Sequence, residues 1–350
     1  MVNQFPIGDR HVGDGAACFL IAEAGVNHNG DINMALELVD IAADSGADAI
    51  KFQTFKAERL VTATAAKADY QKANTDSEET QFEMLKRLEL SEDDHRLLIE
   101  RCRDKGILFM STPFEEQSAD FLDSVDIPVF KIPSGEMTNL PFLAHVAAMD
   151  RPMVISTGMC SLGEVEDAVR VVEDAGHSQF ALLHCVSNYP ADPADVNLRA
   201  MQSLAAAFQV PVGYSDHTVG CEVAVAAVAM GACVIEKHYT LDRSLPGPDH
   251  AASLEPHELK ELVRQIRTVE KALGDGRKRP VANEKNTADV ARKSLVTAVD
   301  LTAGMRIESN HIVARRPGTG MPPSMKPHFL HRTARQTIPA GTILSLEMVE

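Results

Sequence analysis

The chain has 350 residues, of which 45% are hydrophobic and 24% charged, and its formal net charge is −16. This acidic balance argues against a nucleic-acid partner, which would require a basic face. No run of 18 apolar residues occurs, so we predict no membrane-spanning segment. Residues 1–15 are polar and lack an apolar signal core, so we expect a cytoplasmic protein. The six cysteines form no CxxC pair and are expected to be reduced thiols.

Short apolar runs of β type alternate with helical stretches along most of the chain. The predicted strands are 19–24, 48–53, 107–112, 128–134, 153–158, 180–185, 210–215 and 232–238. The predicted helices are 33–45, 78–89, 92–105, 115–125, 139–149, 161–176, 197–208, 220–231 and 256–273. The strands are too uniformly apolar to alternate, which is typical of parallel strands covered on both faces.

Eight strand–helix units in about 275 residues predict an α/β fold of the (β/α)8 type, a TIM barrel. An open doubly wound sheet is the alternative. We consider it weaker because GVNHNG, rather than a glycine-rich dinucleotide turn, follows the first strand.

The helical pattern stops at Leu273, and the last 60 or so residues contain short strands and turns with little helix. We therefore predict a barrel domain over 1–275, a linker over 276–291 and a small, mostly β domain over 292–350. Because so small a domain has a limited core, we expect it to dock on another subunit or to be exchanged with it.

Nearly every predicted strand ends in polar or charged residues, and catalysis in such barrels takes place at the carboxyl ends of the strands. The residues at these ends are Glu23, Asn27, His28, Lys51, Gln53, Ser111, Thr112, Lys131, Ser134, Glu136, Ser156, Thr157, His184, Ser187, Tyr189, Ser215, Asp216, His217, Glu236, Lys237 and His238. A barrel built for stability alone would not need them, because each must be hydrogen-bonded or solvated.

These strand-end residues suggest three kinds of chemistry. Cations and hydroxyl donors that suit a phosphate and a carboxylate are Lys51, Lys131, Ser134, Ser156 and Ser215. His217 and His238, from neighbouring strands, suit a divalent metal with open positions for water and substrate. Glu23 and Glu136 are candidate acid or base groups.

Each assignment has a simpler structural alternative. A single strand-end histidine is more often hydrogen-bonded structure than a metal ligand. Lys51 or Lys131 could instead form an ion pair or a Schiff base. Ser156 could be only a helix N-cap. Asp249, in the Pro/Gly-rich stretch 244–250, could belong to a plain turn, and the pair Arg315 and Arg316 could be solvated surface.

The sequence resembles the sialic acid synthases, which condense phosphoenolpyruvate with an N-acetylmannosamine-type sugar. The resemblance rests on IAEAGVNHNGD, IKFQTFKAERL, STPFEEQSADFL, FKIPSGEMTNLP, ISTGM, LLHCVSNYP, VGYSDHTVG and EKHYTLDRSLPGPDH. The tail, with ARRPGTG and IPAGTIL, is similar to their C-terminal antifreeze-like (SAF) domain. The matching motifs keep one order from about Phe19 to Glu350, which makes the resemblance specific.

The resemblance implies a TIM barrel whose small domain is swapped over the partner's site in a homodimer, so that Arg316 reaches the sugar bound to the other subunit. It implies a synthase that makes N-acetylneuraminate and phosphate from phosphoenolpyruvate and N-acetylmannosamine. The alternative is an N,N'-diacetyllegionaminate synthase that uses 2,4-diacetamido-2,4,6-trideoxymannose.

The resemblance also implies roles for residues. His217 and His238 match metal-binding histidines, usually for manganese, with magnesium or cobalt as alternatives. The matches to phosphoenolpyruvate-binding positions are Thr112, Lys131, Ser134, Ser156 and Ser215, and the matches to sugar-binding positions are Gln53, Glu136, Tyr189, Asp249 and Arg316. Lys51 and Glu23 fall in the same cavity, and with Glu136 they are the candidate catalytic residues.

One position departs from the family pattern. In HCVSNYP, Ser187 stands where an asparagine can bind the phosphate, and Asn188 is one place further on. Serine can still donate one hydrogen bond. The departure leaves the identity of the sugar open and does not affect the expected reaction.

The expected reaction is an aldol-like condensation in which a metal acts as Lewis acid on the sugar aldehyde and Glu136, or second Glu23, handles a proton. Two other functions remain open. A Schiff-base lyase would use Lys51 or Lys131 covalently, and borohydride would trap it. The tail could also be an ice-binding module, which an ice-recrystallisation assay would detect.

Overall fold

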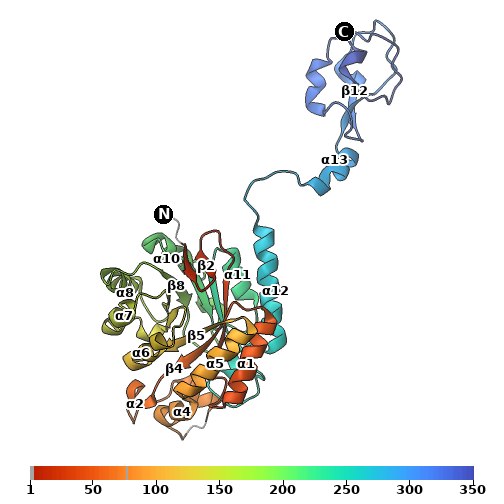
Figure 1. Ribbon diagram of the computed structural model, residues 1–350. Coiled ribbons are helices and arrows are strands. Elements are labelled where there is room, and N and C mark those ends of the chain that lie inside the picture. The colour runs from red at the N-terminus through yellow and green to blue at the C-terminus, as the bar shows by residue number, and fades with distance from the viewer. Residues whose placement is uncertain (1–3, 76–77) are drawn as a thin grey trace. The chain divides into compact units, whose positions relative to one another are not determined.

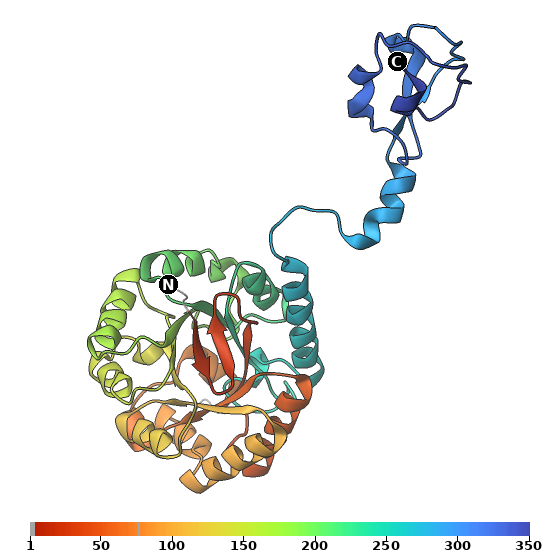
Figure 2. The same cartoon turned by 45° about the horizontal axis from the view of Figure 1, so that its top comes forward.

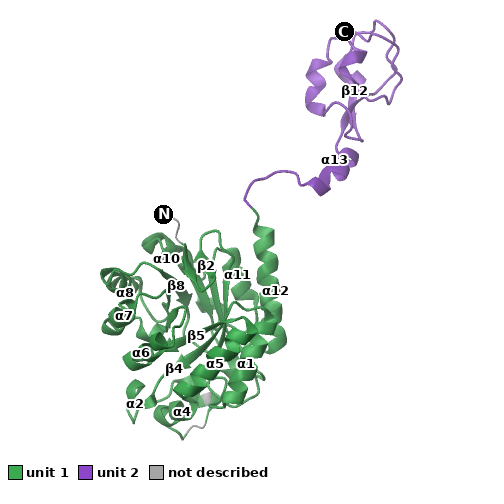
Figure 3. Cartoon of the chain, viewed as in Figure 1, with its two compact units in different colours: residues 1–274 green, residues 275–350 purple. Residues whose placement is uncertain are grey.

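A computed structural model describes residues 4–75 and 78–350. It divides into two compact units, residues 1–274 and residues 275–350 (Figure 3). Among the described residues, no helix combines the length and the apolar character that crossing a bilayer requires.

The first unit is a closed barrel of parallel strands, which confirms the predicted TIM barrel (Figure 1). Its strands are β3 (Phe19–Gly25), β4 (Ala49–Thr54), β5 (Leu108–Pro113), β6 (Phe130–Ile132), β7 (Met153–Ser156), β8 (Phe180–Cys185), β9 (Val212–Asp216) and β10 (Val234–His238). Each strand pairs with the next along the chain, and β10 closes the barrel on β3, with Val234 opposite Phe19 and His238 opposite Glu23. The carboxyl ends of all eight strands therefore meet at one mouth.

A ring of helices surrounds the barrel (Figure 2). They are α1 (Ile32–Ser45), α5 (Glu92–Lys105), α6 (Glu116–Ser124), α7 (Leu140–Ala147), α8 (Leu162–Asp174), α10 (Ala200–Phe208), α11 (Glu222–Ala229) and α12 (Pro256–Leu273). The local sequence determines where these helices begin and end, as α5 illustrates. Helix α5 begins after Ser91, whose hydroxyl accepts a hydrogen bond from the Asp94 amide. It ends before Gly106, which adopts the left-handed conformation at φ 69°. The strands are buried on both faces, one against these helices and one against the barrel interior.

An N-terminal hairpin closes the amino end of the barrel. Strands β1 (Gln4–Ile7) and β2 (Arg10–Gly13) pair antiparallel, and Phe5, Ile7 and Val12 pack with Phe19, Val234 and other side chains near the strand starts. Figure 2 shows the hairpin, in red, crossing the centre of the ring. The sequence analysis identified only a polar N-terminus here, although QFPI and RHVG flank a two-residue Gly-Asp turn typical of a hairpin.

The connection between β4 and α5 carries three short helices. They are α2 (Ala57–Leu60), α3 (Asp69–Asn74) and α4 (Gln81–Leu88). Only the third was predicted, as a helical stretch near 78–89. A further short helix, α9 (Pro193–Val196), follows β8.

The second unit is small, and its two strands form one antiparallel pair. Helix α13 (Lys285–Ala291) precedes β11 (Ser294–Thr297) and β12 (Ile312–Arg315), which pair antiparallel. Its core is built from Leu295, Leu301, Ile307, Ile312, Phe329, Ala334, Ile338, Leu344 and Val349. This confirms a small C-terminal antiparallel sheet, while α13 occupies part of the stretch that was predicted as linker.

Candidate active site

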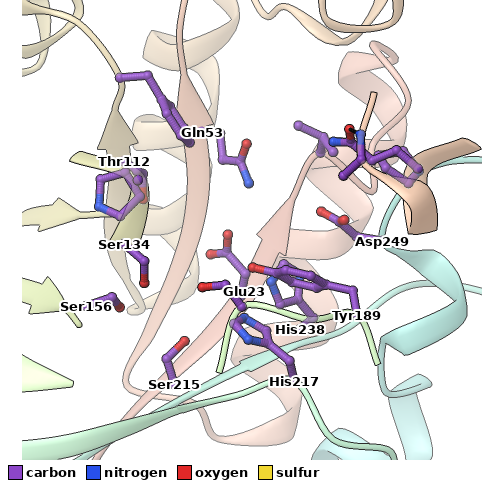
Figure 4. Close-up of a pocket in the computed structure, with 18 of the residues that line it drawn as sticks. Glu23, Gln53, Thr112, Ser134, Ser156, Tyr189, Ser215, His217, His238 and Asp249 are labelled. Carbon is purple, nitrogen blue, oxygen red and sulfur yellow. Dashed lines mark hydrogen bonds between the residues drawn. The ribbon is translucent and has the colours of Figure 1, made fainter. Parts of the chain in front are cut away.

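A cavity of about 470 Å³ opens at the carboxyl ends of the barrel strands. Of the 15 predicted site residues, 14 line it: Glu23, Lys51, Gln53, Thr112, Lys131, Ser134, Glu136, Ser156, Ser187, Tyr189, Ser215, His217, His238 and Asp249. Ten of them are labelled in Figure 4, where Thr112, Ser134 and Ser156 lie on one side and Tyr189, His238 and Asp249 on the other. The remaining residue, Arg316, belongs to the second unit.

The two-residue period of the strands decides which side chains reach the cavity. In β10, Glu236 and His238 line it, whereas Lys237 lies between them and bonds to Asp216 outside it. In β8, Cys185 lines the cavity, and His184 instead lies 2.6 Å from the Val196 carbonyl. Asp216, Lys237 and His184 are therefore structural, as the simpler interpretation of a strand-end residue allows.

Two buried lysines and two buried glutamates form the charged floor of the cavity. Lys51 Nζ lies 3.0 Å from Glu23 Oε2 and 3.5 Å from Glu236 Oε2, and Lys131 Nζ lies 3.3 Å from Glu236 Oε1. Ser215 donates to Glu236 Oε1 at 2.8 Å. Sequence reasoning gave Glu236 no role, although it must share a strand face with His238 two residues later.

The two glutamates and the two lysines of this cluster have pKa values shifted in different directions. Burial raises the pKa of Glu23 to about 7, and Glu236 adds to the shift, although Lys51 opposes it. Burial acts in the same direction on Glu236, but Lys131 and Lys51 outweigh it and bring that pKa down to about 2. Burial lowers the pKa of Lys131, whereas the carboxylates of Glu23 and Glu236 outweigh burial at Lys51 and raise its pKa. Near neutral pH, Glu236 is thus the fixed anion and Glu23 the group able to exchange a proton.

The serine and threonine hydroxyls lie around this floor. Thr112 accepts from Lys51 at 2.8 Å, and Ser134 accepts from the Gly158 amide at 2.9 Å. The Ser156 hydroxyl is buried and has no hydrogen-bond partner among the described residues, so it is free to bind a ligand. Ser187 lines the cavity, whereas Asn188 is exposed.

Three aromatic rings stand together at the ends of β8, β9 and β10. The centroids of His217 and His238 are 5.4 Å apart, and Tyr189 lies 4.1 Å from His217 and 5.5 Å from His238. His217 Nδ1 lies 2.7 Å from the Val186 carbonyl. If Nδ1 donates this hydrogen bond, Nε2 is the nitrogen left for a ligand.

The two histidines fit a metal site with few protein ligands. His238 Nδ1 is buried without a hydrogen-bond partner in the described chain. Burial, together with His217, holds the pKa of His238 well below its ordinary value, so the ring is neutral and able to coordinate. In residues 4–75 and 78–350, no group of three or more His, Cys, Asp or Glu side chains is arranged to hold a metal. The two imidazoles would therefore leave several positions for water and substrate.

The remaining predicted residues lie further out. Gln53 and Glu136 are partly exposed, and Glu136 accepts from Asn139 at 2.7 Å. Asp249 is buried, and burial raises its pKa to about 6. Arg316 is exposed in the second unit, where its Nε donates to the Ala291 carbonyl at 3.0 Å, so its place in the site remains a prediction.

Sequence reasoning missed the part of the lining that the β4–α5 connection supplies. The lining residues from this connection are Leu60, Val61, Ala68, Tyr70, Gln71, Gln81, Met84, Leu85 and Leu88. Tyr70 stacks on Tyr189 with ring centroids 5.0 Å apart. Nothing in the sequence places a long connection over the barrel mouth, so no local signal could have identified these residues.

A closed parallel barrel with a polar, lysine-containing cavity at its carboxyl mouth is the arrangement in which TIM-barrel enzymes place their active sites. The NeuB family model matches residues 38–278. The chain belongs to the NeuB family and is a phosphoenolpyruvate-dependent nonulosonate synthase, which confirms the resemblance to the sialic acid synthases.

Three comparisons illustrate the relationship. The chain is 53% identical to the N,N'-diacetyllegionaminic acid synthase of Legionella pneumophila over 98% of both chains. It is 48% identical to the enzyme of the same name from Campylobacter jejuni, over 90% of this chain and 95% of the relative. The crystal structure of N-acetylneuraminic acid synthetase from Leptospira borgpetersenii aligns with a TM-score of 0.73 at 37% identity, over 82% of this chain and 95% of that one.

Proposed function

We propose that this enzyme condenses phosphoenolpyruvate with 2,4-diacetamido-2,4,6-trideoxymannose, giving N,N'-diacetyllegionaminic acid and phosphate. The relatives at 53% and 48% identity carry that activity in their names, whereas the N-acetylneuraminic acid synthetase is 37% identical. The comparisons thus support the alternative from the sequence analysis better than its first interpretation, an N-acetylneuraminate synthase.

The distribution of cations in the cavity supports one part of this proposal, namely that the sugar carries no phosphate. Among the described residues that line it, Lys51 and Lys131 are the lysines and there is no arginine. Both are buried in the floor, at 3% exposure each. Two cations with surrounding hydroxyls suit the phosphate and carboxylate of one enol phosphate. They leave no further cation for a sugar phosphate, which supports an uncharged sugar.

The floor would hold the enol phosphate before the sugar reacts. Lys131 and Lys51 would neutralise its charge, and Thr112, Ser134, Ser156 and Ser187 would donate hydrogen bonds to its oxygens. Ser215 already donates its one hydroxyl hydrogen to Glu236, so it would support the floor through that carboxylate. Glu236 would not contact the anion favourably. Its role is to hold both lysine ammonium groups and the Ser215 hydroxyl in place, which makes it a positioning residue.

The condensation forms one carbon–carbon bond and consumes one water molecule. The methylene carbon of phosphoenolpyruvate attacks the aldehyde carbon of the open-chain sugar, and the aldehyde oxygen becomes a hydroxyl by taking a proton. Water adds at C2, and the C2–O bond to phosphate breaks, which leaves the keto group. Of the two protons that the water loses, one balances the proton taken by the sugar oxygen and the other leaves with the phosphate. Glu23 suits the proton transfer because its pKa is about 7. The partly exposed Glu136 would bind a sugar hydroxyl.

We propose that His217 and His238 hold a divalent cation, manganese first, with magnesium or cobalt as alternatives. When bound, such a cation supplies Lewis-acid polarisation of the sugar carbonyl. Tyr189 packs against both imidazole rings and would keep them oriented.

We also propose that the second unit completes the site of a partner subunit in a homodimer. Residues 275–350 contain 12 Lys and Arg against 7 Asp and Glu, a net charge of +5. With −16 for the whole chain, residues 1–274 carry −21. Opposite charges on the two units favour docking of one on the other, and Arg316 would donate hydrogen bonds to the sugar.

Phosphate release from phosphoenolpyruvate, measured with manganese and each of two sugars, tests the substrate. We expect release with 2,4-diacetamido-2,4,6-trideoxymannose and little with N-acetylmannosamine. A preference for N-acetylmannosamine would instead identify the enzyme as an N-acetylneuraminate synthase, the first interpretation of the sequence. Release only with N-acetylmannosamine 6-phosphate would contradict the argument from the cation distribution.

A further inference from the structure

One part of the cavity lining is apolar and forms a hydrophobic cluster of its own. Its buried members are Val26, Phe55, Met84 and Leu88, and Leu60, Leu85 and Phe114 pack against them. All of these except Phe55 line the cavity. We call the six lining members, Val26, Leu60, Met84, Leu85, Leu88 and Phe114, the apolar wall.

Three members of the apolar wall keep part of their surface exposed. Met84 and Leu88 are 1% and 2% exposed, because they form the back of the wall, whereas Leu60, Leu85 and Phe114 are only partly buried. In α4, Leu85 lies three residues before Leu88, so both side chains project to the same side of the helix. Within the apolar wall, the exposed surface therefore comes mainly from Leu60, Leu85 and Phe114.

Polar contacts fix the position of the wall without help from a ligand. Glu89, directly after α4, accepts from the Ala57 amide at 2.8 Å and from Lys56 Nζ at 3.1 Å. Lys86 Nζ lies 2.7 Å from Glu58 Oε1. These contacts join α2, which carries Leu60, to α4, which carries Leu85. The wall is thus preorganised, as a specificity surface has to be.

Such a wall does not serve phosphoenolpyruvate, because that molecule is a small, highly charged anion that the floor already suits. Apolar surface stabilises only the apolar parts of a ligand, and a hydroxyl or phosphate desolvated against it loses hydrogen bonds. N-Acetylmannosamine ends in a hydroxymethyl group. The 2,4-diacetamido-2,4,6-trideoxy sugar has a methyl group at that position and a second acetyl methyl at C4.

We infer that the apolar wall selects the sugar: Leu60, Leu85 and Phe114 contact the C6 methyl and the 4-acetamido methyl of the trideoxy sugar. This inference rests on the proposed function and names the residues that determine its specificity. Gln53, Gln71 and Gln81 line the same cavity and offer uncharged partners for the acetamido groups.

The test replaces the wall's leucines by a polar residue of similar size. We expect L60N and L85N each to lower kcat/KM for 2,4-diacetamido-2,4,6-trideoxymannose by about tenfold or more, the usual effect of a lost apolar contact on selectivity. With N-acetylmannosamine the loss should be smaller, and the KM for phosphoenolpyruvate should stay unchanged. L85M keeps volume and apolar character and should keep the wild-type preference.

The control is L97N, because Leu97 lies on α5 outside the cavity lining and is 48% exposed. It should leave both sugars unaffected. Suppose that the wild type prefers the trideoxy sugar, but L60N and L85N do not change the ratio of kcat/KM for the two sugars. The inference about the wall is then wrong, and the proposed function stands. If the wild type prefers N-acetylmannosamine, the proposed substrate fails and the wall inference with it.

Discussion

Lys237 Nζ donates to Asp216 Oδ2 at 2.8 Å, and both side chains are almost completely buried outside the barrel cavity. Lys237 also donates to the Thr218 carbonyl, and Asp216 accepts from Thr218 and Tyr214. The pair joins the ends of β9 and β10 directly behind His217 and His238. It is therefore a structural support for the two histidines rather than part of the chemistry.

We expect D216N to lower the free energy of unfolding by about 3–5 kcal/mol, since removing one partner leaves the other as an uncompensated buried charge. Urea unfolding followed by circular dichroism measures the effect. The double variant D216N/K237M should recover part of the loss. E261Q, which breaks a surface ion pair with Arg264, is the matched control and should change little. A D216N protein as stable as the wild type would contradict the argument.

Gly158 is predicted to be essential for binding of the enol phosphate although it has no side chain. A Cβ at this position would overlap Ser187 Oγ and lie 2.7 Å from Ser134 Oγ. We expect G158A to raise the KM for phosphoenolpyruvate about tenfold or more, because both serines must move and lose hydrogen bonds. In G163A the new Cβ meets nothing within 4 Å, so steady-state kinetics should be unaffected. An unchanged KM in G158A would remove Ser134 and Ser187 from the phosphate site.

Removal of divalent metal should abolish turnover. Lewis-acid assistance contributes several kcal/mol, so we expect a loss of about 10²-fold or more after treatment with EDTA, with recovery on addition of manganese. H217A and H238A should show the same loss without recovery. H257A is the control, because the His257 side chain is 77% exposed on α12. Full activity of H217A, or of the EDTA-treated enzyme, would exclude the proposed metal site.

Arg316 is predicted to act in the site of the partner subunit. R316A and H217A should each be nearly inactive when assayed alone. When the two are unfolded and refolded together, mixed dimers should contain one intact site, made of the R316A barrel and the second unit of the H217A chain. Recovery of up to about a quarter of wild-type activity would support the exchange, since half of randomly formed dimers are mixed and each has one of two sites. Failure of the mixture to recover activity would place Arg316 in its own chain's site or outside any site.

The contribution of His28 to the free energy of unfolding should fall as the pH drops from about 6.5 to about 4. His28 is buried, and burial, with His95, lowers its pKa to about 4. Between pH 6.5, the ordinary pKa of histidine, and pH 4, His28 binds a proton in the unfolded chain but not in the folded chain. The contribution of His28 to stability is therefore fully present above pH 6.5 and is lost as the pH falls toward 4. The expected contribution is about 3 kcal/mol.

The variant H28Q tests this pH dependence. Its amide oxygen can accept from the Gly30 amide, which donates to His28 Nδ1 at 3.0 Å, and it does not titrate. Chemical unfolding at several pH values should therefore show that the free energy of unfolding of the wild type, relative to that of H28Q, falls between about pH 6.5 and about pH 4. A difference between the two proteins that does not change with pH would show that His28 does not contribute.

The sequence was sufficient to predict the barrel because parallel strands covered on both faces need continuous apolar runs, and each run was followed by a helix. It also predicted the cavity, since polar side chains at the ends of nearly all the buried strands are more than the stability of a barrel requires. It did not separate Glu236 from Lys237, because both are polar strand-end residues and neither was given a role. To assign such residues, one must know for each strand whether one given side chain points into the cavity or away from it. The alternation of side chains along the strand then tells which of its other residues face the cavity.

The remaining differences arise where tertiary contacts decide the structure. The N-terminal hairpin has a polar composition overall, and only three side chains, Phe5, Ile7 and Val12, bury it against the barrel interior. Leu60 and Leu85 could have packed in any core, since nothing local places the β4–α5 connection over the barrel mouth. Arg316 lies on a separate unit, so its function depends on an assembly that one chain does not contain.

The hairpin β1–β2 has a kinetic consequence. Because it closes the amino end of the barrel, ligands enter and leave through the mouth alone. Lys131 and Ser156 lie deep, at 3% and 2% exposure, whereas Gln53 and Glu136 are partly open to solvent. A sugar held by the outer residues would block the route to the floor. We therefore expect ordered binding, with the enol phosphate first and the sugar second, and release of inorganic phosphate only after the nine-carbon acid has departed.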